Sequence, residues 1–156
     1  MINIRKSAIK DIKAMVLLSE QKRSEYAEAQ PQFWKKAKNA NEIQEKWFEE
    51  LLERKDYFLY VAEEEISQIL GFIIGRIVPA PEVYSPGGMT MMIDDFCVKN
   101  SDDWDTMGTN LIDTLRNVSK NVAQLLVVCG AHDEPKRKFL KKIGLSVASE
   151  WYVGAN

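Results

Sequence analysis

The chain has 156 residues, 46% hydrophobic and 28% charged, which suits the core and surface of one domain, residues 1–156. Its net charge of −2 argues against nucleic acid as a partner, and its apolar runs are far shorter than the roughly 20 residues that cross a membrane. One histidine and two cysteines offer neither metal-ligand spacing nor a disulfide framework, and the chain opens without a secretion-signal pattern, so we expect a metal-free, cytoplasmic protein.

The first part of the chain predicts a strand followed by two helices. Residues 2–6 alternate between apolar and polar side chains, as strands do. Ser7 is a suitable N-cap for a helix whose apolar spacing continues to about residue 22. An irregular segment follows, and Asn41 then precedes a second helix with an apolar stripe on one side.

Three strands are expected in the middle of the chain. Residues 57–62 and 69–78 are rich in aromatic and β-branched side chains, and three glutamates between them predict a polar hairpin turn. A loop rich in proline and glycine then leads to a third long strand, residues 89–98.

The last third predicts alternating helices and strands. Ser101, Asp102 and Asp103 are capping candidates for a helix that continues to about residue 118. Residues 124–129 form an apolar run, which indicates a strand buried on both faces. A short helix from Pro135 stops at Gly144, and residues 145–153 alternate like a final strand. The expected fold is therefore mixed α/β, in the order β-α-α-β-β-β-α-β-α-β, with a parallel strand–helix–strand unit from Met89 to Gly130.

This order resembles the Gcn5-related N-acetyltransferase (GNAT) superfamily. In residue detail the resemblance is strongest in the strand–loop–helix from Ile93 to Leu115 and in the helix–glycine–strand ending from Asp133 to Trp151. Members bind acetyl-CoA where two central parallel strands splay apart and transfer its acetyl group to an amine. The resemblance implies the same splayed strands here, acetyl-CoA as co-substrate, and a small-molecule amine or a peptide as acceptor.

The cofactor's diphosphate is expected at the start of the helix that follows the third long strand. A helix N-terminus presents unpaired N–H groups and the positive end of the helix dipole. The family signature is Arg or Gln, two residues, Gly, one residue, then Gly or Ala. Gly108 matches its last position, whereas Thr106 and Asp103 stand at the earlier two. Carboxylates nearby would repel a diphosphate, although aspartate is also a common helix cap. The structural and the cofactor interpretations both remain open for this segment.

Other cofactor contacts are implied by the resemblance. The pantetheine arm would pair with the backbone of Phe96, Cys97 and Val98, although all three also suit a plain core strand. Lysines and an arginine on the last helix would meet phosphate or simply face solvent. The complete set of candidate cofactor-binding residues is Phe96, Cys97, Val98, Trp104, Thr106, Met107, Gly108, Thr109, Asn110, Asp133, Lys136 and Arg137.

Acetyl transfer needs a group that accepts a proton from the amine, and Asp94 and Asp95 are the candidates. Consecutive strand residues point to opposite faces, so we expect one of them to face the cleft. A carboxylate in a semi-buried strand must be satisfied, and an ion pair with Arg76 is the alternative role. Leu140 stands where relatives have a tyrosine acid, which leaves the tyrosines Tyr84 and Tyr152 and also His132 as candidates, with Tyr84 and His132 preferred.

Tyr26, Phe33, Trp34 and Tyr84 are the candidates for contact with the acceptor, with helix packing as the alternative for the aromatic residues before position 40. The sequence thus predicts an acetyl-CoA-dependent N-acetyltransferase that works by direct attack of the amine. The alternative is a catalytically weak or inactive module on the same scaffold. The final strand could also support a homodimer.

Overall fold

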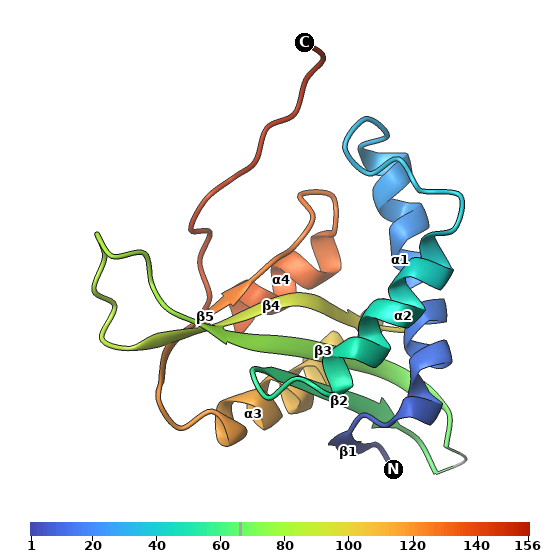
Figure 1. Ribbon diagram of the computed structural model, residues 1–156, viewed down its shortest axis with the longest axis horizontal. Helices are drawn as coiled ribbons and strands as arrows, with labels where there is room; N and C mark the ends of the chain where they lie inside the picture. The colour runs from blue at the N-terminus through green and yellow to red at the C-terminus, as the bar shows by residue number, and fades with distance from the viewer. Residues whose placement is uncertain (66) are drawn as a thin grey trace.

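The computed structural model describes residues 1–65 and 67–156, and its centre is a five-stranded mixed sheet (Figure 1). The strands follow one another in chain order across the sheet: β1 (Asn3–Lys6), β2 (Tyr57–Glu63), β3 (Ile69–Val78), β4 (Met89–Val98) and β5 (Val122–Val127). Neighbours from β1 to β4 are antiparallel, and β5 is parallel to β4.

Helices cover both faces of this sheet. They are α1 (Ile12–Ala29), α2 (Ala40–Leu52), α3 (Thr109–Val118) and α4 (Glu134–Lys142), with short helical turns at Ile9–Asp11, Ser101–Asp103 and Trp104–Gly108. Met15 of α1 and Phe48 of α2 pack on one face, against Phe72 of β3. Leu111 of α3 and Phe139 of α4 belong to the core cluster of the opposite face. Side chains that alternate along β3 feed both clusters, which is why its sequence is apolar almost throughout.

A β-bulge interrupts β4 at Asp94. Gly75 of β3 lies opposite Ile93, whereas the preceding Ile74 lies opposite Asp95, so Asp94 is an extra residue without a partner. The faces of the strand change accordingly: Ile93 and Phe96, three residues apart, both belong to the core beneath α3 and α4. Regular alternation would put residues with this odd spacing on opposite faces.

The two parallel strands separate just beyond this bulge. The last paired positions are Ile93 and Val127, and the N–H of Val128 donates to the carbonyl of Ile93 at 2.9 Å. From there β4 continues to Val98 without β5 beside it. The splayed central strands expected from the sequence are therefore present.

The helical turns before α3 begin at Ser101, among the capping candidates of the predicted helix. Two other expectations about the second half of the fold are wrong. The apolar run at residues 124–129 is not buried on both faces, since Leu126 is 40% exposed and Val128 45%. Residues 145–153 form no strand, because they extend away from the sheet and find no backbone to pair with (Figure 1).

Gly71 provides a test of how tightly β3 packs. A Cβ at this position would lie 2.8 Å from Sδ of Met107 and 3.0 Å from the carbonyl oxygen of Cys97. We expect Gly71→Ala to lower the free energy of unfolding by about 1–3 kcal/mol, because the backbone oxygen cannot move without distorting the sheet. Gly154→Ala is the control, since nothing lies within 4 Å of that position. Urea denaturation of both variants measures the difference, and equal stability would contradict this packing.

Candidate active site

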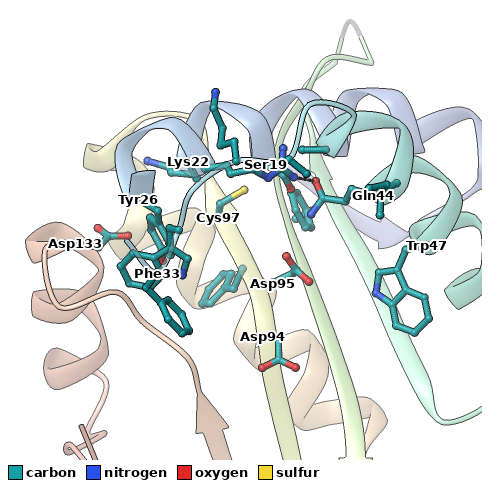
Figure 2. A pocket seen from close by; sticks show the side chains of 18 of the residues that line it. Ser19, Lys22, Tyr26, Phe33, Gln44, Trp47, Asp94, Asp95, Cys97 and Asp133 are labelled. Carbon is teal, nitrogen blue, oxygen red and sulfur yellow. Dashed lines mark hydrogen bonds between the residues drawn. The ribbon is translucent and has the colours of Figure 1, made fainter. Parts of the chain in front are cut away.

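A pocket of about 530 Å³ lies between α1, α2 and the part of β4 that follows the bulge. Figure 2 shows Asp94 and Asp95 on β4 facing this space, with Tyr26, Phe33 and Asp133 at one end and Trp47 at the other. Of the predicted site residues, the pocket brings together Tyr26, Phe33, Trp34, Asp94, Asp95, Phe96, Cys97, Asp133 and Lys136.

Both aspartates line the pocket, contrary to the expectation that only one would face it. The bulge is the physical reason, because an extra residue breaks the alternation of the strand at this point. Burial, with the neighbouring charge of Asp94, raises the pKa of Asp95 from 3.8 to about 6. Asp95 is thus a carboxylate that can exchange a proton near neutral pH.

The ion pair suggested between these aspartates and Arg76 is not formed. Arg76 donates to the hydroxyl of Tyr57 at 3.4 Å and contacts the sulfur of Met92. Within residues 1–65 and 67–156, neither aspartate takes part in a salt bridge. Their charge remains available to a ligand.

Lys136 occupies the gap between the separated strands. Its side chain is buried, and its Nζ donates to the carbonyl oxygen of Phe96 at 2.9 Å, on the part of β4 that β5 has left. The ammonium also lies 5.4 Å from the ring centre of Phe96 and 5.7 Å from that of Trp104. Burial lowers the pKa of Lys136.

The start of α4 fixes the direction in which Lys136 points. Asp133 is the N-cap, its Oδ1 accepts from the backbone N–H of Lys136 at 3.3 Å, and Pro135 stands in the first turn. Arg137, by contrast, donates to the carbonyl of Ala131 at 3.1 Å. The two basic residues considered together in the sequence therefore have different environments.

An aromatic cluster of Tyr26, Trp34 and His132 forms one end of the site. The ring centre of Tyr26 lies 4.7 Å from that of Trp34 and 4.5 Å from that of His132. The N–H of Gly130 donates to the Tyr26 hydroxyl at 3.3 Å, and burial raises the pKa of Tyr26 to about 12. His132 packs against the rings of Tyr26 and Trp34, and its Nε2 is buried without a hydrogen-bond partner among the described residues. The His132 ring lies close to Gly130, because a Cβ at that position would be 2.6 Å from it and the ring would have to shift.

The segment expected to cradle a diphosphate does not form an open loop. Trp104 is buried, and its ring centre lies 5.2 Å from that of Phe139, which it stacks on, and 4.9 Å from that of Phe96, which it meets edge-on. The turn before α3 is therefore already packed into the core. The hydroxyls of Thr106 and Thr109 donate to carbonyls of the preceding turn. Met107 and Gly108 are buried in the same core, and Asn110 is exposed.

Two further candidates lie away from the pocket, and one lies within it as a buried thiol. Tyr84 is 71% exposed, in the loop between β3 and β4 that projects on the side of the molecule opposite α1 (Figure 1). Val98 faces the core beneath α3. Cys97 does line the pocket, but burial raises the pKa of its thiol to about 12, so it stays protonated.

Polar residues of α1 and α2 also line the pocket, and the sequence interpretation missed them. They include Ser19, Lys22, Arg23 and Gln44. The first three precede Tyr26 at helical spacing, so they share its side of α1. Placing the end of α1 at Ala29 instead of residue 22 would have revealed this face.

No family model and no curated protein matches the sequence. Solved structures do match over nearly the whole chain. A predicted acetyltransferase with acetyl-CoA from Clostridium acetobutylicum is 22% identical with a TM-score of 0.71, covering 99% of this chain and 96% of that one. The aminoglycoside 6'-N-acetyltransferase of Acinetobacter baumannii is 9% identical with a TM-score of 0.72, covering 100% and 99%. A mutant of the BH1408 protein of Bacillus halodurans is 13% identical with a TM-score of 0.86, with 99% of each chain covered.

The chain has the GNAT fold. The resemblance stated from the sequence is thereby confirmed at the level of architecture, including the mixed sheet and the helices on both faces. In the described part of the chain, no helix is both long and apolar enough to cross a bilayer.

The backbone at the gap suits the pantetheine arm of acetyl-CoA, whereas residues 104–110 do not suit its diphosphate. The carbonyl of Phe96 already accepts a hydrogen bond from an N–H donor, Lys136, which is the same chemistry that an amide of the pantetheine arm would supply. The segment 104–110 does not fit a diphosphate, since it is helical and carries Asp105, held by Lys142 at 2.6 Å. Acetyl-CoA would therefore have to displace the Lys136 side chain and take its phosphate contacts elsewhere.

The pKa of Asp95 can be measured directly by following its carboxyl carbon by NMR. We expect titration near pH 6 in the unaltered protein. In Asp94→Asn the pKa falls, because one negative neighbour is gone, yet stays above 3.8, because burial is the larger cause. Asp113→Asn, on the exposed side of α3, is the control and should leave the pKa of Asp95 unchanged. A value near 4 in the unaltered protein would show that Asp95 is solvated like a surface carboxylate.

Proposed function

We propose that this protein is an acetyl-CoA-dependent N-acetyltransferase that acetylates the amine of a small molecule or a peptide. The observation that carries the proposal is the pair of aspartates on the bulge of β4, in a pocket next to the gap between the parallel strands. Similarity to solved acetyltransferases supports the class of reaction at the level of the fold.

Asp95 would act as the general base. Acetyl-CoA, when bound, would supply the acetyl thioester. A protonated amine in the pocket would be attracted by Asp94 and Asp95, and it must lose one proton to become a nucleophile. A carboxylate with a pKa of about 6 is ionised at neutral pH, yet it is a better proton acceptor than a surface aspartate. The exposed Asp94 would help to hold the ammonium form of the acceptor.

The acceptor would lie between the carboxylates and the aromatic residues Tyr26, Phe33 and Trp34. Aromatic faces attract cations, and carboxylates bind them, so the pocket suits a positively charged amine on an apolar or aromatic carrier. Lys22 and Arg23 also line the pocket, with their charges paired to Glu25 and Glu20.

A second candidate function is a weakly active or inactive ligand-binding module. Three observations favour it: the helical segment at 104–108, the carboxylates of Asp102 and Asp105 near the helix start, and the ammonium of Lys136 in the gap. Each would weaken binding of acetyl-CoA without preventing a ligand from entering the pocket beside Asp95.

Turnover distinguishes the two functions. With a panel of amines, release of free thiol from acetyl-CoA should rise with pH through about 6 and then level off, because Asp95 must be ionised to act. Asp95→Asn should reduce kcat by about 100-fold or more and abolish this acidic limb. Asp94→Asn, the matched control, should keep the limb and move it to lower pH.

Two results would contradict the proposal. Unchanged turnover in Asp95→Asn would remove Asp95 from the mechanism. Binding of amines without thiol release by the unaltered protein would favour the inactive module.

A further inference from the structure

The pocket continues past the two aspartates into a second, smaller lobe. This lobe has a volume of about 140 Å³ and lies between α2, β2, β3 and β4. Trp47, Asp94 and Asp95 line both lobes, so the carboxylates stand where the two lobes meet. The larger lobe contains Phe96, beside the gap between the parallel strands, whereas the smaller one contains Arg76. A ligand held by the aspartates can therefore extend into both lobes.

Arg76 is the one charged residue of β3, and strand alternation explains why it faces the smaller lobe. Phe72 and Ile74 belong to the core cluster beneath α1 and α2, and Arg76 follows two positions later on the same face. The extra residue of the bulge lies in β4, so the alternation of β3 is undisturbed. The Arg76 side chain is thus half-buried in this lobe, beside Tyr57 and Met92.

The guanidinium of Arg76 has hydrogen-bond donors that the protein does not use. Its Nη1 donates to the Tyr57 hydroxyl at 3.4 Å, and its Nη2 contacts the sulfur of Met92, a weak acceptor, at 3.4 Å. Within the described part of the chain, its buried Nε has no hydrogen-bond partner and its charge forms no salt bridge. The carboxylate of Asp56 accepts from Arg54 instead, at 3.0 and 2.8 Å. A buried donor of this kind calls for an acceptor supplied from outside the protein.

We propose that the acceptor is an amino acid, whose amine binds at Asp94 and Asp95 and whose carboxylate binds Arg76 in the smaller lobe. This inference rests on the proposed function, because it names the substrate class of the same site. A guanidinium donates two parallel hydrogen bonds to a carboxylate, and Arg76 has the free donors for them. A volume of about 140 Å³ is several times that of a water molecule, so a carboxylate and the carbon that carries it fit.

The spacing of the charges suits one small molecule that carries both groups. Ile74 lies opposite Asp95, and Arg76 follows Ile74 by two positions, which is roughly 7 Å along the strand. The carboxylates and the guanidinium line one lobe and yet do not pair with each other. An ammonium on one side and a carboxylate on the other would satisfy both. The side chain of the amino acid would then extend into the larger lobe, toward its aromatic residues.

Calorimetric titration in the absence of acetyl-CoA tests this site separately from catalysis. The probes are leucine, phenylalanine and tryptophan, each used as the free amino acid, as its amide and as the amine that lacks the carboxylate. We expect at least one free amino acid to bind about tenfold or more tightly than its amide and its amine, because only the free acid can pair with Arg76. The amide represents a residue at the start of a peptide, so the series also distinguishes a free amino acid from a peptide.

Arg76→Gln should remove this preference by lowering the affinity for the free acid about tenfold, while the affinity for the amine stays the same. Arg76→Lys keeps the positive charge and should keep part of the preference. Arg116→Gln is the matched control, because Arg116 is exposed on α3 and pairs with Asp113 at 2.9 Å. Circular dichroism of each variant checks that it is folded.

Three results would overturn the amino-acid site: equal affinity for the acid, the amide and the amine, a preference that survives in folded Arg76→Gln, or no binding by any probe. Binding with the expected preference, but without release of thiol from acetyl-CoA, would support the amino-acid site and contradict the proposed function. The two failures are therefore distinguishable.

Discussion

One extra residue in β4 determines how the candidate site is built. The bulge at Asp94 shifts the strand so that Asp94 and Asp95 both line the pocket, while Ile93 and Phe96 both stay in the core. The parallel partner leaves immediately after Ile93, so the same point in the sheet has two carboxylates on one face and free backbone at its edge. Pocket, proton acceptor and gap thus depend on a single irregularity, and bulges are common at sites where a side chain must be redirected.

Where a strand loses its neighbour, its backbone N–H and C=O groups need other hydrogen-bond partners. Here Lys136 binds the carbonyl of Phe96 from the first turn of α4, and the rings of Phe96 and Trp104 partly compensate the buried ammonium. Burying a cation carries a cost of several kcal/mol, which the hydrogen bond and nearby carboxylates offset. A donor from a ligand could replace Lys136 and return its ammonium to water.

Much of the fold could be predicted from the sequence, because the apolar periodicity of α2, β3 and β4 reports which faces are buried. The carboxylates of β4 and the aromatic residues before position 40 were also identified, since polar groups in an apolar strand and aromatic residues in an irregular segment are unusual. Strand alternation could not reveal the bulge, and so it separated Asp94 from Asp95. The strand pattern of residues 145–153 was recognised, but a pattern does not say which sheet edge is available. The family signature points to a diphosphate site at residues 103–108, and it could not reveal that Trp104 is buried in the core there.

Calorimetric titration of acetyl-CoA into the protein and into Lys136→Met tests the central claim, that the gap beside Phe96 is the cofactor groove and that Lys136 occupies it. Methionine keeps most of the volume of the side chain but cannot donate to the carbonyl of Phe96. Acetyl-CoA should bind Lys136→Met about tenfold or more tightly than the unaltered protein, while Lys138→Met, on the exposed side of α4, should leave the affinity unchanged. Equal or weaker binding to Lys136→Met would show that the cofactor does not use this gap.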